Sequence, residues 1–156
     1  MSSDPDGIAE LRAEIDAVER SALRRVDPGV RGAVIAGAIM LLLVAITLPW
    51  VGSASGWDVL RGTTDPLARV GLLPRLFLGV ALGLGVGLST LALVTRRWGL
   101  VWASALGCAY CVLDGVWAIW SRQTVHGPGP GIGMVLAVLA VAVLAVQWLR
   151  LALSRR

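Results

Sequence analysis

The 156-residue sequence has little of the material from which catalytic and metal-binding sites are usually built. It contains one histidine, two cysteines and no lysine. His126 has no cysteine or carboxylate nearby in the sequence, so it does not indicate a metal site. Residues 127–133 alternate glycine with proline and apolar residues, and no Lys-Ser/Thr pair follows, which excludes a phosphate-binding loop of the Walker type. We therefore expect no metal and no cofactor.

Charged residues are also scarce, at 15% of the chain, whereas hydrophobic residues make up 56% and the mean hydropathy is +0.77. These values are unusual for a protein whose surface faces water. Four apolar stretches, each long enough at about 1.5 Å per residue to cross a hydrocarbon core of roughly 30 Å, account for them. They are residues 33–50, 72–95, 98–120 and 132–149. The sequence therefore predicts an all-α membrane protein with four transmembrane helices in an antiparallel bundle.

All fourteen basic residues are arginines, and their distribution predicts an orientation. Ten lie in segments that share one side of the predicted bundle, and the other four lie on the opposite side. Because arginine-rich loops stay in the cytoplasm, we expect both termini to be cytoplasmic in a multi-pass plasma-membrane protein. The seven tryptophans fall near the predicted helix ends, as in aromatic belts. No face that mixes arginines with aromatics is evident, so we expect membrane lipids and no nucleic acid as partners.

The chain divides into three regions by composition. Residues 1–31 form a polar segment in which Ile8, Leu11, Ile15 and Val18 are spaced three and four apart, which predicts a short cytoplasmic amphipathic helix and a linker. Residues 32–152 are the predicted transmembrane domain, and residues 153–156 are a cytoplasmic tail. The sequence leaves open whether the amphipathic helix contacts the bundle, lipid or a partner.

Small residues recur at every fourth position on two of the predicted helices. The two stripes are Gly79, Gly83 and Gly87 on the second helix and Gly107, Cys111 and Gly115 on the third. Such stripes let two helix backbones approach closely. The tight link at Arg96 and Arg97 makes these helices antiparallel neighbours, so we expect the stripes to pack on each other within one chain. A homo-oligomer interface is the alternative.

Asp114 is the only acidic residue inside a predicted span, and a carboxylate left charged and unpaired in lipid is costly. Tyr110 lies one helical turn before it, on the same predicted face. Arg75 enters the neighbouring helix from the same end. We therefore predict a polar pair of Asp114 and Arg75, with Tyr110 beside it, that joins the second and third helices. Proton or substrate handling by these residues is the alternative.

Cys108 and Cys111 form a C-x-x-C motif, which resembles that of the thiol:quinone oxidoreductases in four-helix membrane bundles. Those enzymes carry a second cysteine pair in an outside loop, whereas this chain has two cysteines in all. Both cysteines lie in the middle of a predicted span, where a thiolate is disfavoured. Packing as small apolar residues is the favoured role.

Four short strings are characteristic when taken together: residues 56–60 (GWDVL), 95–98 (TRRW), 120–124 (WSRQT) and 127–131 (GPGPG). They resemble a family of small four-span integral membrane proteins of mycobacteria and related actinobacteria. The resemblance covers roughly residues 30–156. It implies a plasma-membrane location and a four-span architecture but no particular activity.

Packing signals are thus abundant and catalytic groups scarce. The sequence favours a non-enzymatic plasma-membrane protein that self-associates or joins a larger envelope complex, with Trp57 and Asp58 exposed in an outside loop. A small oligomeric transporter or lipid-handling protein that uses Asp114 and Arg75 is the first alternative. A quinone-linked thiol oxidoreductase that uses Cys108 and Cys111 is the second.

Overall fold

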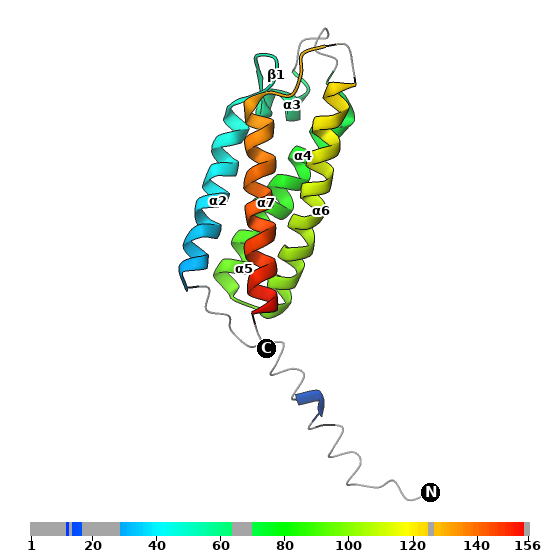
Figure 1. Cartoon of the computed structure of the whole chain (residues 1–156). Helices are drawn as coiled ribbons and strands as arrows, with labels where there is room; N and C mark the ends of the chain where they lie inside the picture. Colours follow the sequence, from blue (N-terminus) through cyan, green and yellow to red (C-terminus); the bar gives the residue numbers. More distant parts are fainter. Residues whose placement is uncertain (1–11, 13, 17–28, 64–69, 125–126, 155–156) are drawn as a thin grey trace, which may run out of the picture.

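The computed structural model describes residues 12, 14–16, 29–63, 70–124 and 127–154. In this part of the chain, long helices lie side by side, and a small β-hairpin with a short helix closes one end of the bundle (Figure 1). The elements are α2 (Gly29–Thr47), β1 (Pro49–Val51), β2 (Ala54–Ser55), α3 (Gly56–Arg61), α4 (Leu72–Val80), η2 (Ala81–Leu88), α5 (Ser89–Thr95), α6 (Trp98–Gln123) and α7 (Ile132–Leu153).

The helix over residues 72–95 is continuous, but its middle third, η2, is a π-helix. Each π-helical hydrogen bond spans five residues instead of four, and such segments are usually a single turn. At its end, the Ser89 hydroxyl donates to the carbonyl oxygen of Leu84, five residues earlier, at 3.4 Å.

Helix α7 is the central element of the bundle, because it packs against both α6 and α2. Its inner face carries the small residues Ala137 and Ala140, both fully buried, which allow the neighbouring helices to approach closely. Large side chains such as Leu42, Phe77 and Leu144 fill the core around them.

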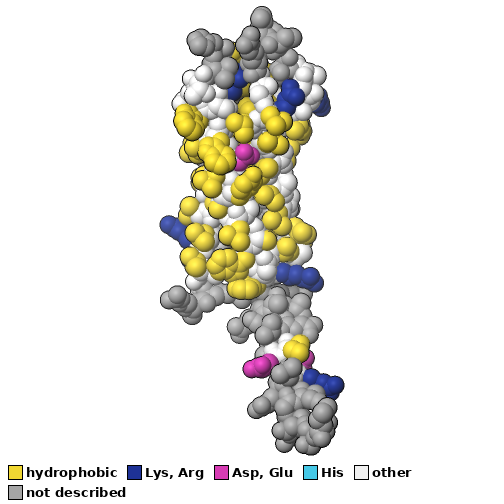
Figure 2. Space-filling model, turned by 90° about the vertical axis from the view of Figure 1, so that its right-hand side faces the viewer, with side chains coloured by type: hydrophobic (Ala, Val, Ile, Leu, Met, Phe, Trp, Pro, Cys, Tyr) yellow, Lys and Arg dark blue, Asp and Glu magenta, His cyan; other side chains and the backbone are white. Residues whose placement is uncertain are grey.

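The outer faces of the helices are also apolar. Hydrophobic side chains cover the middle of the bundle, with basic side chains near its two ends (Figure 2). By length and composition alone, four helices in the described part of the chain could cross a membrane. They are residues 29–47, 72–95, 98–123 and 132–153.

Trp50 lies at the centre of the closed end, the end of the bundle that β1, β2 and α3 cover (Figure 1). Its side chain is fully buried, and its indole Nε1 donates a hydrogen bond to the carbonyl oxygen of Ala45 at 2.8 Å. Its ring lies 5.6 Å from that of Phe77 on α4. The amide of Gly131, just before α7, donates to the Trp50 carbonyl oxygen at 2.7 Å. The hairpin, α2, α4 and the start of α7 therefore meet at one indole.

The helix bounds differ from the predicted spans at four places, the first being that α2 begins at Gly29, four residues before the predicted start at 33. Helix α2 ends at Thr47, where residue 50 was predicted, because Pro49 disfavours helical backbone at the residue before it. Helices α6 and α7 continue to Gln123 and Leu153, three and four residues beyond the predicted ends at 120 and 149, because polar residues end an apolar run without ending a helix. The predicted amphipathic helix lies mostly outside the described residues, of which 12 and 14–16 are helical.

Candidate functional site

The predicted polar pair is on neighbouring helices, but the structure does not join its members. Asp114 on α6 is 5% exposed, and its Oδ2 has no hydrogen-bond partner among the described residues. Nε of Arg75 on α4 also has none there. The Arg75 guanidinium lies beside Gly62, the residue that ends α3, so that a Cβ placed on Gly62 would lie 3.4 Å from Nη2. Arg75 therefore extends along the closed end of the bundle.

Tyr110 and Asp114 have different environments although they are one turn apart. Tyr110 is 55% exposed, whereas Asp114 faces the interior. Four residues turn an α-helix slightly more than a full circle, so the two side chains are offset around the helix axis. This offset is enough to separate an outer position from an inner one. The structure therefore places Tyr110 on the outer surface of the bundle and Asp114 toward its interior.

Arg122 is a buried cation that the sequence analysis did not single out. It is 3% exposed, and its Nη2 donates to the carbonyl oxygen of Pro128 at 2.7 Å. This bond ties the end of α6 to the Gly-Pro loop that precedes α7. The signal was present in the sequence, because Arg122 continues the four-residue spacing of the buried positions Asp114 and Ala118.

The two glycine stripes have different roles in the structure. A Cβ placed on Gly79 or Gly83 would meet nothing within 4 Å, so these positions face outward. Gly87 is exposed as well. Gly85, inside η2, faces the bundle instead, where an added Cβ would lie 2.9 Å from Leu42. Gly85 is two residues from Gly83, about half a helical turn, so the two lie on opposite faces, and the face of the four-residue glycine spacing is not the packing face.

On α6 the small residues do face the neighbouring helix. A Cβ on Gly107 would lie 3.4 Å from Leu84, and one on Gly115 would lie 2.8 Å from the Phe77 ring and 2.7 Å from Val138. Cys111, between them, is fully buried. The second helix therefore contacts this stripe with large side chains.

Cys108 belongs to a buried polar cluster that the sequence analysis missed. The Trp148 indole on α7 donates to Ser89 Oγ at 2.9 Å, and Ser89 Oγ lies 3.7 Å from Cys108 Sγ. Cys108 and Cys111 are both free and buried. The cluster links α5, α6 and α7 through side chains, so the structure places Cys108 in a packing and hydrogen-bonding role. Nothing in the sequence spacing relates residues 89 and 148.

Trp57 and Asp58 lie on α3 at the closed end. Trp57 is 39% exposed. Asp58 forms a capping box with Ser55: the Ser55 amide donates to Asp58 Oδ2 at 3.0 Å, and the Asp58 amide donates to Ser55 Oγ at 3.3 Å. The Ser55 hydroxyl also donates to Oδ2 at 2.7 Å, and these bonds lower the pKa of Asp58. Ser55 is therefore the N-cap of α3, and Asp58 is the N3 residue that completes the capping box.

This cap predicts a pH-dependent contribution to stability. The folded state favours the charged carboxylate, so the stabilisation is fully present above the unfolded pKa of about 3.9 and is lost as the pH falls through the lower folded pKa. We expect Asp58→Asn to remove this part of the acid dependence of unfolding between pH 7 and pH 3. Ser55→Ala should have a smaller effect in the same direction, because it removes the hydroxyl donor but keeps the backbone amide that donates to Oδ2. Parallel stability curves for Asp58→Asn and the parent would contradict the assignment.

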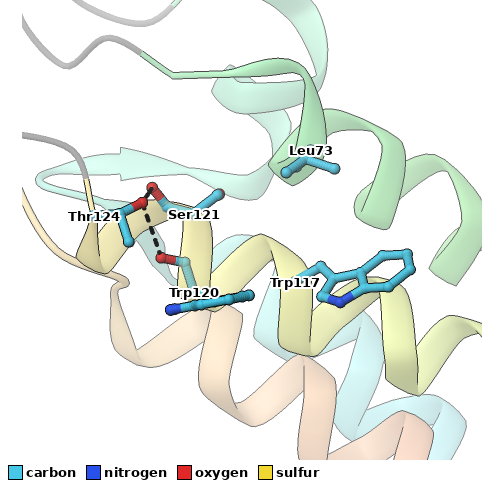
Figure 3. A pocket seen from close by; sticks show the side chains of 5 residues that line it. All are labelled: Leu73, Trp117, Trp120, Ser121 and Thr124. Atoms are coloured by element: carbon cyan, nitrogen blue, oxygen red, sulfur yellow. Dashed lines mark hydrogen bonds between the residues drawn. The ribbon is translucent and has the colours of Figure 1, made fainter.

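A shallow hollow lies between the start of α4 and the end of α6, with a volume of about 310 Å³ (Figure 3). Its lining consists of Leu73, Trp117, Trp120, Ser121 and Thr124. The Thr124 hydroxyl is close to the carbonyl oxygens of Trp120 and Ser121, and the Ser121 hydroxyl donates to Ala118 at 2.7 Å. The hydroxyl hydrogens are thus directed to the helix itself, and the hollow offers mainly two exposed indoles.

The described part of the chain is a helical domain with apolar sides and with its charged groups concentrated toward the two ends. The family model of the MiaB C-terminal domain matches residues 12–156, so the chain belongs to that family. A curated relative is the tRNA-2-methylthio-N(6)-dimethylallyladenosine synthase of Mycobacterium avium (strain 104), which is 48% identical over 155 residues. These cover 97% of this chain and 22% of the relative, so the chain spans about a fifth of that protein's length. No solved structure matches.

The family match overturns the membrane interpretation. The resemblance to a four-span membrane family was wrong, since the region that carried it, roughly residues 30–156, lies within the stretch matched by the MiaB C-terminal domain. The predicted fold class of four transmembrane helices and the predicted plasma-membrane location are wrong for the same reason. The physical reason is that hydropathy measures composition and helix length, not the surroundings of a helix. Apolar helices of sufficient length therefore do not show a membrane protein here.

The same comparison corrects the expected function and partners. A non-enzymatic membrane subunit, with a transporter or a thiol oxidoreductase as alternatives, does not agree with 48% identity to a region of a tRNA-modifying synthase. The exclusion of nucleic acid in favour of membrane lipids was also wrong, because the relative that is 48% identical to this chain is a tRNA-modifying synthase. In the structure, arginines from distant parts of the sequence share one end of the bundle.

Proposed function

We propose that this chain serves tRNA modification as the C-terminal helical domain of a tRNA-2-methylthio-N6-dimethylallyladenosine synthase, working with the remaining four-fifths of such an enzyme. The observation that carries the proposal is the 48% identity to that synthase over 97% of the chain. Identity at this level, over the whole helical domain, supports a shared role. The family match over residues 12–156 supports it independently.

The structure supports a docking and substrate-holding role within that enzyme. A rigid closed end, with Arg122 tied to Pro128 and Trp50 bonded to Ala45, gives a stable support. The apolar outer faces of the helices provide area that the rest of the synthase would cover. An exposed apolar surface of this kind is typical of a contact region.

Deleting the coding region for residues 12–156 in its host tests the proposal. We expect the 2-methylthio-N6-dimethylallyladenosine content of total tRNA to fall at least severalfold. N6-dimethylallyladenosine, which lacks only the 2-methylthio group, should accumulate in its place. Nucleoside mass spectrometry of digested tRNA measures both. Re-expression of the segment should restore the ratio. An unchanged ratio in the deletion strain, with the rest of the synthase present at its normal level, would refute the proposal.

A further inference from the structure

One end of the bundle carries exposed arginines from three distant parts of the sequence. Arg31 lies near the start of α2, Arg96 and Arg97 lie between α5 and α6, and Arg150 lies in the last turn of α7 (Figure 1). All four are exposed. Nη1 of Arg31 is 3.4 Å from the carbonyl oxygen of Arg150, which shows that the two lie side by side. These four residues are called the basic end below.

The acidic residues that the structure describes in the bundle lie away from the basic end. Between residues 29 and 154 they are Asp58 on α3 and Asp114 in the half of α6 nearer the closed end. The closed end differs, because Arg122 is buried there, Arg75 is half-buried, and the exposed Arg61 lies close enough to the Asp58 carboxylate to stabilise its charge. Exposed positive charge is therefore concentrated at the basic end, where it attracts polyanions.

Two features at the basic end favour a nucleic acid over a simple anion. Trp98 directly follows Arg97, is 37% exposed, and contacts Trp102 edge-on with ring centroids 6.1 Å apart. An exposed indole beside guanidinium groups suits a base and its phosphate together. Arg96 has a φ of 52°, a left-handed conformation in which glycine is the usual residue at a helix end. A charged residue at a position that favours glycine indicates a role for the side chain.

We propose that the basic end, with Trp98, binds the ribose-phosphate backbone of tRNA. This inference rests on the proposed function and assigns its substrate contact to named residues. Guanidinium groups bind phosphate oxygens in a bidentate manner. Four exposed arginines are therefore enough to bind several phosphates along one strand. Trp98 adds stacking for an unpaired base. The closed end then faces away from the RNA.

Binding of an unmodified tRNA transcript to the full chain tests the proposal. We expect the triple variant Arg31→Gln, Arg97→Gln, Arg150→Gln to bind at least ~10-fold more weakly by fluorescence anisotropy at low salt. A plot of log affinity against log salt concentration has a negative slope. Its magnitude should decrease by about 0.7 to 0.9 for each phosphate that the variant no longer neutralises. Arg61→Gln, an exposed arginine of α3 at the closed end, is the matched control and should bind like the parent.

Two further variants keep the test decisive. The triple Arg→Lys variant preserves charge and should retain most of the binding, which separates lost charge from misfolding. Trp98→Ala should weaken binding about 5-fold or more, and Trp98→Phe should restore most of it. The proposal is overturned if the triple Gln variant binds tRNA like the parent, or if Arg61→Gln weakens binding as much.

A parallel binding measurement with phosphatidylglycerol vesicles distinguishes binding of RNA from binding to an anionic lipid surface. Loss of vesicle binding in the triple Gln variant, with tRNA binding unchanged, would assign the basic end to lipid and overturn the proposal. The proposed function fails separately, through an unchanged 2-methylthio nucleoside ratio after deletion. A changed nucleoside ratio together with unaltered tRNA binding by the variants would refute the role of the basic end and leave the proposed function standing.

Discussion

Gly131→Ala is expected to destabilise the domain by about 2–4 kcal/mol. A Cβ at this position would collide with the carbonyl oxygen of Pro49 and lie 2.8 Å from its carbonyl carbon and 2.9 Å from that of Trp50. All three atoms belong to backbone, which cannot rotate away as a side chain can. The Gly131 amide also donates to Trp50 at 2.7 Å, so moving the loop outward would break that bond.

Gly129→Ala is the matched control for this substitution. It lies two residues earlier in the same Gly-Pro loop, and an added Cβ there would meet nothing within 4 Å. We expect its free energy of unfolding to stay within about 0.5 kcal/mol of the parent value. Chemical denaturation followed by far-ultraviolet circular dichroism compares the two variants. Equal stability of both would show that the close approach of the loop to β1 is absent in solution.

The sequence predicted the positions of the long helices well, because long apolar runs constrain where helices lie. Residues 72–95 form a continuous helix with the expected ends, and the third helix begins at Trp98 as expected. The hydropathy that located these helices could not identify their surroundings. Membrane-spanning helices and apolar helices that pack on other protein have the same composition. The family match was needed to decide between them.

The candidate sites were less predictable, because they depend on which way each side chain points. A four-residue glycine spacing predicts that the glycines share one face of the helix but not which way that face points, and in the structure Gly79 and Gly83 face outward while Gly85 faces inward. The Ser89 and Trp148 hydrogen bond joins residues 59 positions apart, which no local pattern encodes.

The arginines of the basic end were among the ten that the sequence analysis placed on one side of the bundle, but that placement was interpreted as membrane topology. In the structure, the antiparallel packing of α2 and α7 brings Arg31 beside Arg150, and the turn between α5 and α6 adds Arg97 and Trp98 at the same end. The expectation that arginines and aromatics share no face therefore failed once the chain was folded.

Trp50→Ala should destabilise the domain by about 3–5 kcal/mol, because it empties the site where four elements meet. The indole is fully buried, lies 5.6 Å from the Phe77 ring and donates to Ala45 at 2.8 Å. Its removal leaves a cavity under the hairpin and removes a hydrogen bond from a buried carbonyl. Because Gly131 and Gly133 pack directly against the Trp50 residue, neither segment can move far enough to fill the space without disrupting its own packing.

Two companion variants separate the contributions of Trp50. Trp120→Ala removes an indole that is 63% exposed, so it should cost less than about 1 kcal/mol although the substitution is chemically the same. Trp50→Phe keeps much of the packed volume but removes the Nε1 donor, so it should fall between the parent and Trp50→Ala, with the missing hydrogen bond accounting for about 1 kcal/mol. Denaturation midpoints under one set of conditions rank the variants. If Trp50→Ala were no less stable than Trp120→Ala, the closed end would not depend on this indole, and α7 would be held to the hairpin by the backbone contacts of Pro130 and Gly131 instead.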